Sequence, residues 1–218
     1  MPPQSTPKSR AAFRRRLLAW FRVAGRDLPW RRTRDPYRVL VSEFMLQQTQ
    51  VSRVLEFYPR FLARYPDLGA LARAKPRAVR ETWEGLGYYR RAANLHRLAR
   101  EVVRHHAGAV PSEPAELVKL PGIGPYTAGA VATFAYEKAA PAVDTNVRRV
   151  LKRVFGCRTA KEVTATAELL QGRRGKTAWA FNQALMELGA LVCTARAPKC
   201  GECPVRKYCT WYRTTCNL

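Results

Sequence analysis

The chain has 218 residues, enough for one large domain or two small ones. Its 39 Lys and Arg residues outnumber 16 Asp and Glu residues, and the resulting formal charge of +23 favours a polyanionic partner such as nucleic acid over a solvated basic surface. No apolar run approaches the roughly 18 residues of a membrane-spanning helix, and no apolar signal segment opens the chain, so we expect a reducing, intracellular location (cytoplasm or nucleoid).

Apolar residues recur at helical spacing along most of the chain. No segment alternates with the period of two that marks a half-buried strand. Proline and glycine separate the helical segments. We therefore predict an all-α fold with helices over residues 9–24, 39–46, 51–64, 68–72, 76–83, 89–106 and 113–119, and a further helix from Tyr126.

Residues 120–125 read L-P-G-I-G-P between two of these helices. A G-x-G turn exposes backbone N–H groups beside the positive end of the next helix, and together they form an anion site. Gly122 and Gly124 would let a phosphate backbone approach closely, and Pro125 suits a first helical turn. The alternative is an ordinary tight linker between packed helices.

Four cysteines near the C-terminus follow the spacing C-x6-C-x2-C-x5-C: Cys193, Cys200, Cys203 and Cys209. Such a quartet can hold a [4Fe-4S] cluster, a zinc ion or two disulfides. Zinc sites usually pair two C-x2-C knuckles or add histidines, whereas this chain has one knuckle and its histidines lie far upstream. Disulfides suit secreted proteins. An iron–sulfur cluster is therefore the predicted cofactor.

The hairpin, the run V-D-T-N-V-R-R-V at 143–150 and the cysteine spacing together resemble the endonuclease III superfamily of DNA glycosylases, from about Phe13 to Cys209. The resemblance implies two helical domains with a DNA-binding cleft between them. We expect an N-terminal segment at 1–29 that packs with the cluster domain, a six-helix barrel with the hairpin at 30–137, and the iron–sulfur cluster domain at 138–218. The implied partner is double-stranded DNA with a mismatched or damaged base pair, bound by a monomer.

Three further runs resemble the MutY type of adenine glycosylase: L-P-W-R at 28–31, V-S-E-F-M-L-Q-Q-T-Q at 41–50 and G-L-G-Y-Y at 85–89. That type excises adenine mispaired with guanine or 8-oxoguanine during base excision repair. Bifunctional members of the superfamily carry a lysine just after the hairpin that forms a Schiff base with the sugar. Tyr126 stands at that position here, and Lys119 precedes the hairpin, so the resemblance implies a monofunctional enzyme.

Adenine is a poor leaving group and its departure leaves a cationic sugar, so the reaction needs an acid near the base and a carboxylate near the sugar. The resemblance assigns Glu43 as the acid, acting at adenine N7, and Asp144 as the carboxylate. Asp144 is also a good N-cap for the helix that follows. Tyr126 would hydrogen-bond in this site, and Glu187 would either support the acid or be structural.

The resemblance also implies contacts with DNA. Tyr88 would be the wedge inserted between bases once the target adenine leaves the stack, and Gln48 would fill the vacated space. Thr49 and Leu86 would contact the orphaned guanine. The full set expected to bind DNA is Arg31, Gln48, Thr49, Leu86, Tyr88, Gly122 and Gly124.

Two features depart from the MutY pattern. Thr145 follows the catalytic aspartate where glycine is usual. The chain ends nine residues after Cys209, so we expect either a truncated piece or a naturally short form, in both cases without the C-terminal NUDIX-like domain. Recognition of 8-oxoguanine is therefore left open. Two alternatives stay in view: a mismatch thymine or uracil glycosylase acting at T:G or U:G, and a non-catalytic, cluster-bearing DNA-binding protein.

Overall fold

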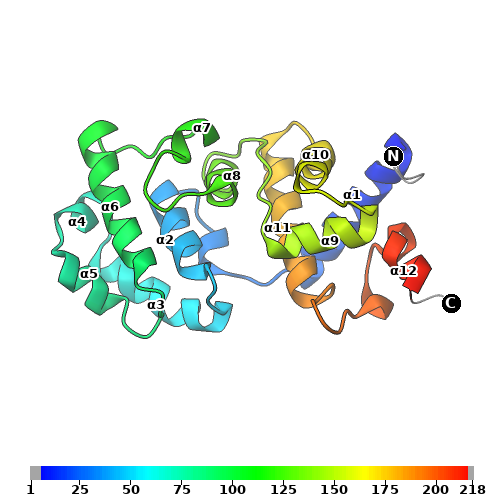
Figure 1. Ribbon diagram of the computed structural model, residues 1–218, viewed down its shortest axis with the longest axis horizontal. Coiled ribbons are helices and arrows are strands. Elements are labelled where there is room, and N and C mark those ends of the chain that lie inside the picture. Colours follow the sequence, from blue (N-terminus) through cyan, green and yellow to red (C-terminus); the bar gives the residue numbers. More distant parts are fainter. Residues whose placement is uncertain (1–5, 216–218) are drawn as a thin grey trace. The chain divides into compact units, whose positions relative to one another are not determined.

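The computed structural model describes residues 6–215, and this part of the chain is helical without a strand, which confirms the predicted all-α class (Figure 1). Three short 3-10 turns, η1 (Pro29–Arg31), η2 (Cys200–Glu202) and η3 (Arg206–Tyr208), accompany the α-helices. The α-helices are α1 (Pro7–Ala24), α2 (Pro36–Leu46), α3 (Val51–Arg64), α4 (Leu68–Arg73), α5 (Pro76–Thr82), α6 (Arg90–His105), α7 (Pro114–Leu117), α8 (Pro125–Phe134), α9 (Thr145–Phe155), α10 (Ala160–Gln171), α11 (Gly175–Leu191) and α12 (Thr210–Thr215).

Helix α2 starts three residues before the predicted position because its first turn is stabilised by two local features. Asp35 is the N-cap, and its carboxylate accepts hydrogen bonds from the backbone N–H groups of Tyr37 and Arg38. Pro36 occupies the first helical position, where its missing N–H leaves no hydrogen bond unmade. Apolar periodicity alone does not predict such a start, because Asp35 and Pro36 act through hydrogen bonding and backbone geometry.

The helices form two compact units. The middle unit runs from Asp27 to Tyr136, and the terminal unit combines the chain up to Arg26 with the chain from Glu137 onward. Helix α1 thus belongs with α9 to α12, which follow it by more than a hundred residues in the sequence (Figure 1). The finer division expected from the sequence, with boundaries at 29/30 and 137/138, stays a prediction.

The middle unit is built around large buried side chains from α2, α3 and the turn after α5. Phe61 lies edge-on against Trp83, with ring centroids 5.6 Å apart and planes at 87°. Phe44, Phe61 and Trp83 are all fully buried. Helix α2 packs against α3, α6 and α8, so it is the central helix of this unit.

The terminal unit has its own aromatic core centred on Phe13 of α1. The Phe13 ring contacts Phe155 of α9 at 5.1 Å, Tyr208 at 6.3 Å and Phe181 of α11 at 6.5 Å between centroids. These contacts fasten the N-terminal helix to the segment that carries the cysteines. Within residues 6–215, no helix has the length and apolar character needed to cross a membrane.

Candidate functional site

Glu43 lies in the second half of α2, in the interior of the middle unit, and only 4% of it is exposed. Its neighbours on the helix are buried on every side: Val39, Leu40, Val41, Ser42, Phe44 and Met45. A carboxyl group removed from water can retain a proton that an exposed one would lose. The fold therefore provides Glu43 with the surroundings of a general acid.

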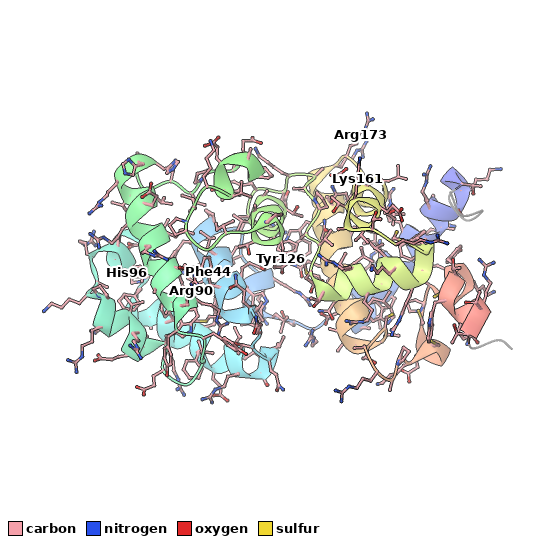
Figure 2. The ribbon with its side chains drawn as sticks, in the orientation of Figure 1. Phe44, Arg90, His96, Tyr126, Lys161 and Arg173 are labelled. Carbon is pink, nitrogen blue, oxygen red and sulfur yellow. The ribbon has the colours of Figure 1, made fainter. Side chains whose placement is uncertain are left out.

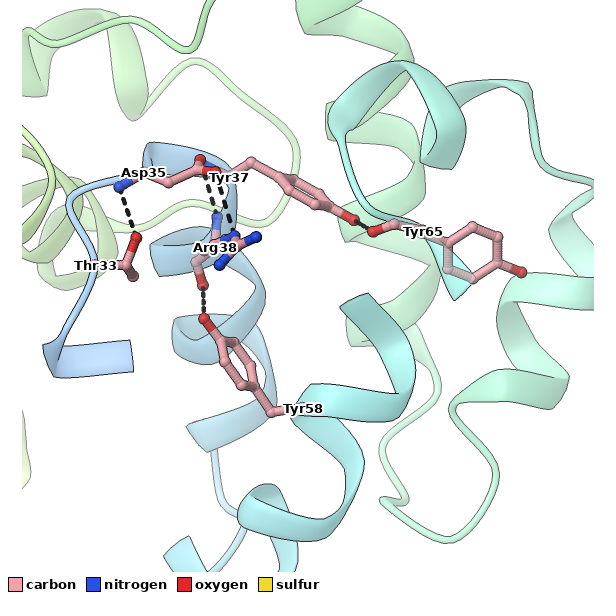
Figure 3. Close-up of polar contacts among 6 residues, drawn as sticks. All are labelled: Thr33, Asp35, Tyr37, Arg38, Tyr58 and Tyr65. Carbon is pink, nitrogen blue, oxygen red and sulfur yellow. Dashed lines mark hydrogen bonds and ion pairs between the residues drawn. The ribbon is translucent and has the colours of Figure 1, made fainter. Parts of the chain in front are cut away.

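The helix that carries Glu43 is held at its start by two tyrosine hydroxyls (Figure 3). The hydroxyl of Tyr37 donates to the carbonyl of Tyr65 at 2.7 Å, and the hydroxyl of Tyr58 donates to the carbonyl of Arg38 at 3.2 Å. Burial raises the pKa of Tyr37 and raises the pKa of Tyr58 to about 12, so both remain protonated donors at neutral pH. These bonds fix α2 relative to α3 and to the segment that precedes α4.

The two hairpin glycines lie in different surroundings. Gly122 has a φ of +79°, and a Cβ atom there would lie 2.7 Å from Cβ of Asn94 and 2.9 Å from Cε1 of Phe44. Gly124 caps α8 with a φ of −97°, and a Cβ atom there would meet no other atom within 4 Å. Gly122 is thus required by the packing of the hairpin on α2 and α6, whereas Gly124 leaves open space in front of the backbone.

Tyr126 is half-buried in the first turn of α8, a helix that packs on α2 (Figure 2). Glu43 and Tyr126 therefore belong to neighbouring helices of one unit. Lys119 precedes the turn, is largely exposed, and its ammonium lies 2.7 Å from the carboxylate of Glu116. Lys119 is thus paired with Glu116 on the stretch before the turn, whereas Tyr126 stands after it.

The residues expected to read DNA in the middle unit occupy two loops. Gln48 and Thr49 lie between α2 and α3, and Leu86 and Tyr88 lie before α6. Gln48 and Tyr88 have φ values of 57° and 47°, which are uncommon for residues with a side chain. Tyr88 is 60% exposed and Leu86 only 5%, so a DNA contact by Leu86 would come mainly from its backbone. Arg31, in η1, is half-buried.

Arg91 was missed by the sequence analysis, although its guanidinium touches both of these loops. It is 7% exposed and donates hydrogen bonds to backbone carbonyls of each loop. Nothing in a run of arginines distinguishes the buried one from its exposed neighbour Arg90. The helical period is the available signal, because it places Arg91 on the same face as Leu95 and Leu98, both fully buried.

Asp144 is the N-cap of α9 in the terminal unit, as the sequence predicted. Its Oδ1 accepts a hydrogen bond from the N–H of Val147 at 2.6 Å, and its Oδ2 accepts one from Nδ2 of Asn146 at 2.9 Å. Burial raises the pKa of this carboxyl group, while these bonds and the nearby Arg149 act in the opposite direction. Thr145 is exposed in the first turn of α9.

Asn146 and Arg149 form a support behind Asp144 that the sequence analysis did not identify. Arg149 donates to Oδ1 of Asn146 and to the carbonyl of Gly189, each at 2.7 Å. A Cβ atom on Gly189 would lie 2.6 Å from Cβ of Asn146, so α11 approaches the start of α9 closely only because it has glycine there. This packing fixes the amide that points at the Asp144 carboxylate.

Glu187 is fully buried in α11 and pairs with Arg26 from the end of the α1 segment. Nε and Nη2 of Arg26 donate to its two carboxylate oxygens at 2.7 and 3.0 Å, and the Arg26 backbone N–H donates at 2.9 Å. The bidentate bond to Glu187 raises the pKa of Arg26. This part-buried pair joins segments 161 residues apart in the sequence.

The four cysteines of the quartet line one cavity. Its walls include Val150, Val154 and Leu188. Burial, followed by the proximity of the other three thiols, raises the pKa of Cys203 to about 11. Four thiols that face one cavity suit a thiolate-liganded cluster, because binding of the metal centre displaces the thiol protons.

Within the part of the chain that the structure describes, no three His, Cys, Asp or Glu side chains are arranged to ligate a metal ion. Four cysteine thiols around one cavity are the donor set that holds a [4Fe-4S] cluster.

Two polar contacts reach the sulfurs from protein N–H groups. Nη1 of Arg153 lies 3.4 Å from Sγ of Cys193, and the backbone N–H of Tyr212 donates to Sγ of Cys209 at 3.4 Å. Arg153 also donates to the carbonyls of Thr194 and Ala195 at 2.7 and 2.9 Å. N–H groups directed at cysteine sulfurs are the usual way in which a protein stabilises the charge of an iron–sulfur cluster.

Two protein families match this chain. The family described as HhH-GPD superfamily base excision DNA repair protein matches residues 41–173. The iron–sulfur binding domain of endonuclease III matches residues 193–209, the span of the cysteine quartet. The predicted [4Fe-4S] cofactor is thereby confirmed.

The relatives of this chain include two kinds of DNA glycosylase. The chain is 45% identical over 219 residues to an adenine DNA glycosylase of Mycobacterium tuberculosis, covering 97% of this chain and 71% of that protein. It is 39% identical over 210 residues to a thymine-DNA glycosylase of Aeropyrum pernix, covering 92% of this chain and 94% of that one. The solved structure of a thermostable thymine-DNA glycosylase superposes with a TM-score of 0.89 at 33% identity, covering 95% of this chain and 98% of that one.

Proposed function

Since the chain belongs to the HhH-GPD superfamily of base excision DNA repair proteins, we propose that it is a monofunctional DNA glycosylase that releases adenine mispaired with guanine or 8-oxoguanine. It would act as a monomer on double-stranded DNA. The observation that supports adenine as the released base is the burial of the Glu43 carboxyl group, which belongs to the central helix of the middle unit.

Glu43 supplies the proton that adenine needs in order to leave. The N-glycosidic bond breaks with its electrons moving to the base, and protonation of N7 turns an unstable anion into a neutral leaving group. Pyrimidines have no N7. A carboxyl group held out of water on an anchored helix is suited to this step, since the packing around it keeps it in place during the reaction.

Asp144 stabilises the positive charge that develops on the sugar. Two hydrogen bonds, from Val147 and Asn146, orient its carboxylate at the start of α9. Since burial raises its pKa, the ionised form is held at some cost in free energy, and a cationic sugar beside it relieves that cost. The transition state therefore gains more from this carboxylate than the neutral substrate does.

Tyr126 makes the enzyme monofunctional. A phenol cannot form a Schiff base with the sugar, and the nearby amine of Lys119 is engaged by Glu116 on the other side of the turn. The product is an abasic site in an unbroken strand.

Binding to DNA relies on the hairpin and on the two loops of the middle unit. The open space before Gly124 at the start of α8 suits a phosphate group. Tyr88, exposed at a loop tip, enters the stack as the adenine leaves, and Gln48 takes up the space beside the orphaned base. Arg31 and Thr49 complete this surface.

Cys193, Cys200, Cys203 and Cys209 would hold the iron–sulfur cluster, and four cysteine ligands would leave no ligand position for substrate. Its role would be to order the segment that follows α11. The arginines of α9 anchor the start of this segment through the Cys193, Thr194 and Ala195 carbonyls.

A mismatch thymine or uracil glycosylase is the second candidate. It is favoured by the thymine-DNA glycosylase that this chain covers over 94% of its length. Glu43 argues against it, because a buried acid has no N7 to protonate on a pyrimidine.

One set of substrates separates the candidates. The protein is incubated with matched duplexes containing A:8-oxoG, A:G, T:G or U:G, and abasic sites are revealed by alkali. We expect strand breaks in the two adenine duplexes, and only after alkali. Cleavage of T:G or U:G alone would favour the second candidate, breaks without alkali would contradict the monofunctional assignment, and binding without cleavage of any duplex would favour a non-catalytic DNA-binding protein.

A further inference from the structure

We propose that Arg91 is a positioning residue that holds two loops in one fixed relation, so that base extrusion and base release are coupled through its guanidinium. The loops are the glutamine loop (residues 47–50) and the tyrosine loop (residues 84–89). The inference rests on the proposed function, because these are the loops assigned there to the orphaned base and to the wedge.

The guanidinium first closes the end of the helix that carries Glu43. Nη1 of Arg91 donates to the carbonyls of Phe44 at 3.0 Å and Met45 at 2.7 Å, and also to that of Gln47. The first two carbonyls belong to the last turn of α2, where no helical N–H is available to them. A positive charge at a helix C-terminus is favourable as well. Arg91 thus acts as the C-terminal cap of the catalytic helix.

The other nitrogen joins the two loops. Nη2 donates to Oγ1 of Thr49 at 3.0 Å in the glutamine loop, and to the carbonyls of Leu86 at 3.0 Å and Gly87 at 3.1 Å in the tyrosine loop. The same guanidinium lies 5.5 Å from the ring centroids of Tyr88 and Trp83. One buried group therefore contacts the wedge residue, its loop and the loop opposite.

These contacts counteract local strain. Gln48 and Tyr88, one in each loop, both adopt left-handed φ values that residues with a side chain rarely occupy. Such conformations persist when surrounding contacts over-determine them. Since Arg91 bonds to residues on either side of Gln48 and immediately before Tyr88, it is the side chain best placed to maintain both.

A lysine side chain at position 91 could not make this set of hydrogen bonds. The planar guanidinium presents several N–H groups in a fixed fork, whereas an ammonium offers three donors at a single point. The six oxygens that Arg91 bonds belong to two loops and a helix end. Arg91→Lys keeps the positive charge but cannot make the hydrogen bonds that join the two loops to the end of α2.

The test measures base extrusion directly. A duplex carries 2-aminopurine, which brightens when it is unstacked, at the target position opposite guanine. Fluorescence is recorded at saturating protein for wild type, Arg91→Lys and Arg91→Met. Arg90→Met is the matched control, because it removes the same charge from the exposed neighbour in the same helical turn (Figure 2). Single-turnover release of adenine from an A:G duplex is measured in parallel.

At saturating protein, we expect both Arg91 variants to give a reduced fluorescence rise and to release adenine at least about tenfold more slowly. Arg90→Met should give the wild-type fluorescence rise. A purely structural role would reduce the folded fraction, which thermal melting reports, without changing the fluorescence at saturation.

Wild-type fluorescence and rate in Arg91→Lys would overturn the proposal, and this variant serves if Arg91→Met fails to fold. Failure of the proposed function looks different. In that case wild-type protein releases no adenine, while the fluorescence comparison among the variants still reports whether Arg91 orders the loops.

Discussion

Replacing each hairpin glycine by alanine separates a requirement of the fold from a requirement of DNA binding. At Gly122 the new methyl group meets two obstacles. The φ of +79° is unfavourable for alanine, and the Cβ atom would lie 2.7 Å from Cβ of Asn94 and 2.9 Å from Cε1 of Phe44. Carbon atoms pack best at about 3.5–4.0 Å, so either the hairpin or these side chains must move.

The cost can be estimated from these two terms. A left-handed conformation costs alanine about 1–2 kcal/mol, and overpacking of a filled site adds about 1–3 kcal/mol. A total of about 3 kcal/mol would lower the melting temperature by roughly 6–12 °C in a protein of this size. Gly124→Ala is the matched control, since its φ is −97° and its Cβ meets nothing within 4 Å.

Gly124→Ala should leave the melting temperature unchanged or slightly raised, because alanine restricts the unfolded chain by about 0.4–1 kcal/mol relative to glycine. It should instead weaken binding to an abasic-site duplex, since the methyl group occupies the space proposed for a phosphate. Thermal unfolding and fluorescence anisotropy with labelled DNA measure the two effects. Equal melting temperatures for the two variants would refute the packing argument at Gly122, and unchanged DNA affinity of Gly124→Ala would refute the phosphate site.

Three further substitutions test the site and its surroundings. Asp144→Asn should keep the α9 cap, so its unfolding free energy should lie within about 1 kcal/mol of that of wild type. The variant should nevertheless lose base release, and substantial turnover would contradict the role of the carboxylate. The pKa of Asp144 is raised in the folded protein. The unfolding free energy of wild type should therefore fall relative to that of this variant as pH increases from about 4 towards the folded pKa. Parallel plots of unfolding free energy against pH for the two proteins would exclude the effect. Tyr88→Ala should leave the melting temperature nearly unchanged and slow base extrusion, measured by 2-aminopurine fluorescence; unaltered extrusion would remove the wedge assignment. Burial, with Arg100 nearby, lowers the pKa of His96, so the unfolding free energy should fall as pH drops below about 6.5. Urea unfolding of His96→Leu should show a weaker dependence of this free energy on pH. An equal pH dependence in both proteins would show that another group is responsible.

Local patterns in the sequence predicted most of the helices and the role of Asp144 as a helix cap. The apolar period located the helices of the middle unit, because one face of each is buried. Asp144 was predicted as a cap from the residues that follow it, and its bond to Val147 confirms the cap. Both predictions depend on neighbours within one helical turn, which a sequence displays directly.

What the sequence did not reveal depends on contacts between distant segments. Arg26 and Glu187 pair across 161 residues, and Arg91 reaches back to the end of α2. Gly189 permits the approach of α11 to Asn146, a role that no local pattern indicates. In a chain with 39 Lys and Arg residues, composition cannot separate an arginine that binds carbonyl groups inside the fold from one that faces solvent.

The most direct test of the account is the single-turnover rate of adenine release by Glu43→Gln on an A:8-oxoG duplex. Glutamine preserves the size of the buried side chain and removes its acidic proton. We expect the rate to fall by about 10²–10⁴-fold while the affinity for an abasic-site duplex and the melting temperature stay close to those of wild type. A rate near that of wild type would contradict the assignment of Glu43 as the proton donor, and with it the argument that this chain is built to release a purine.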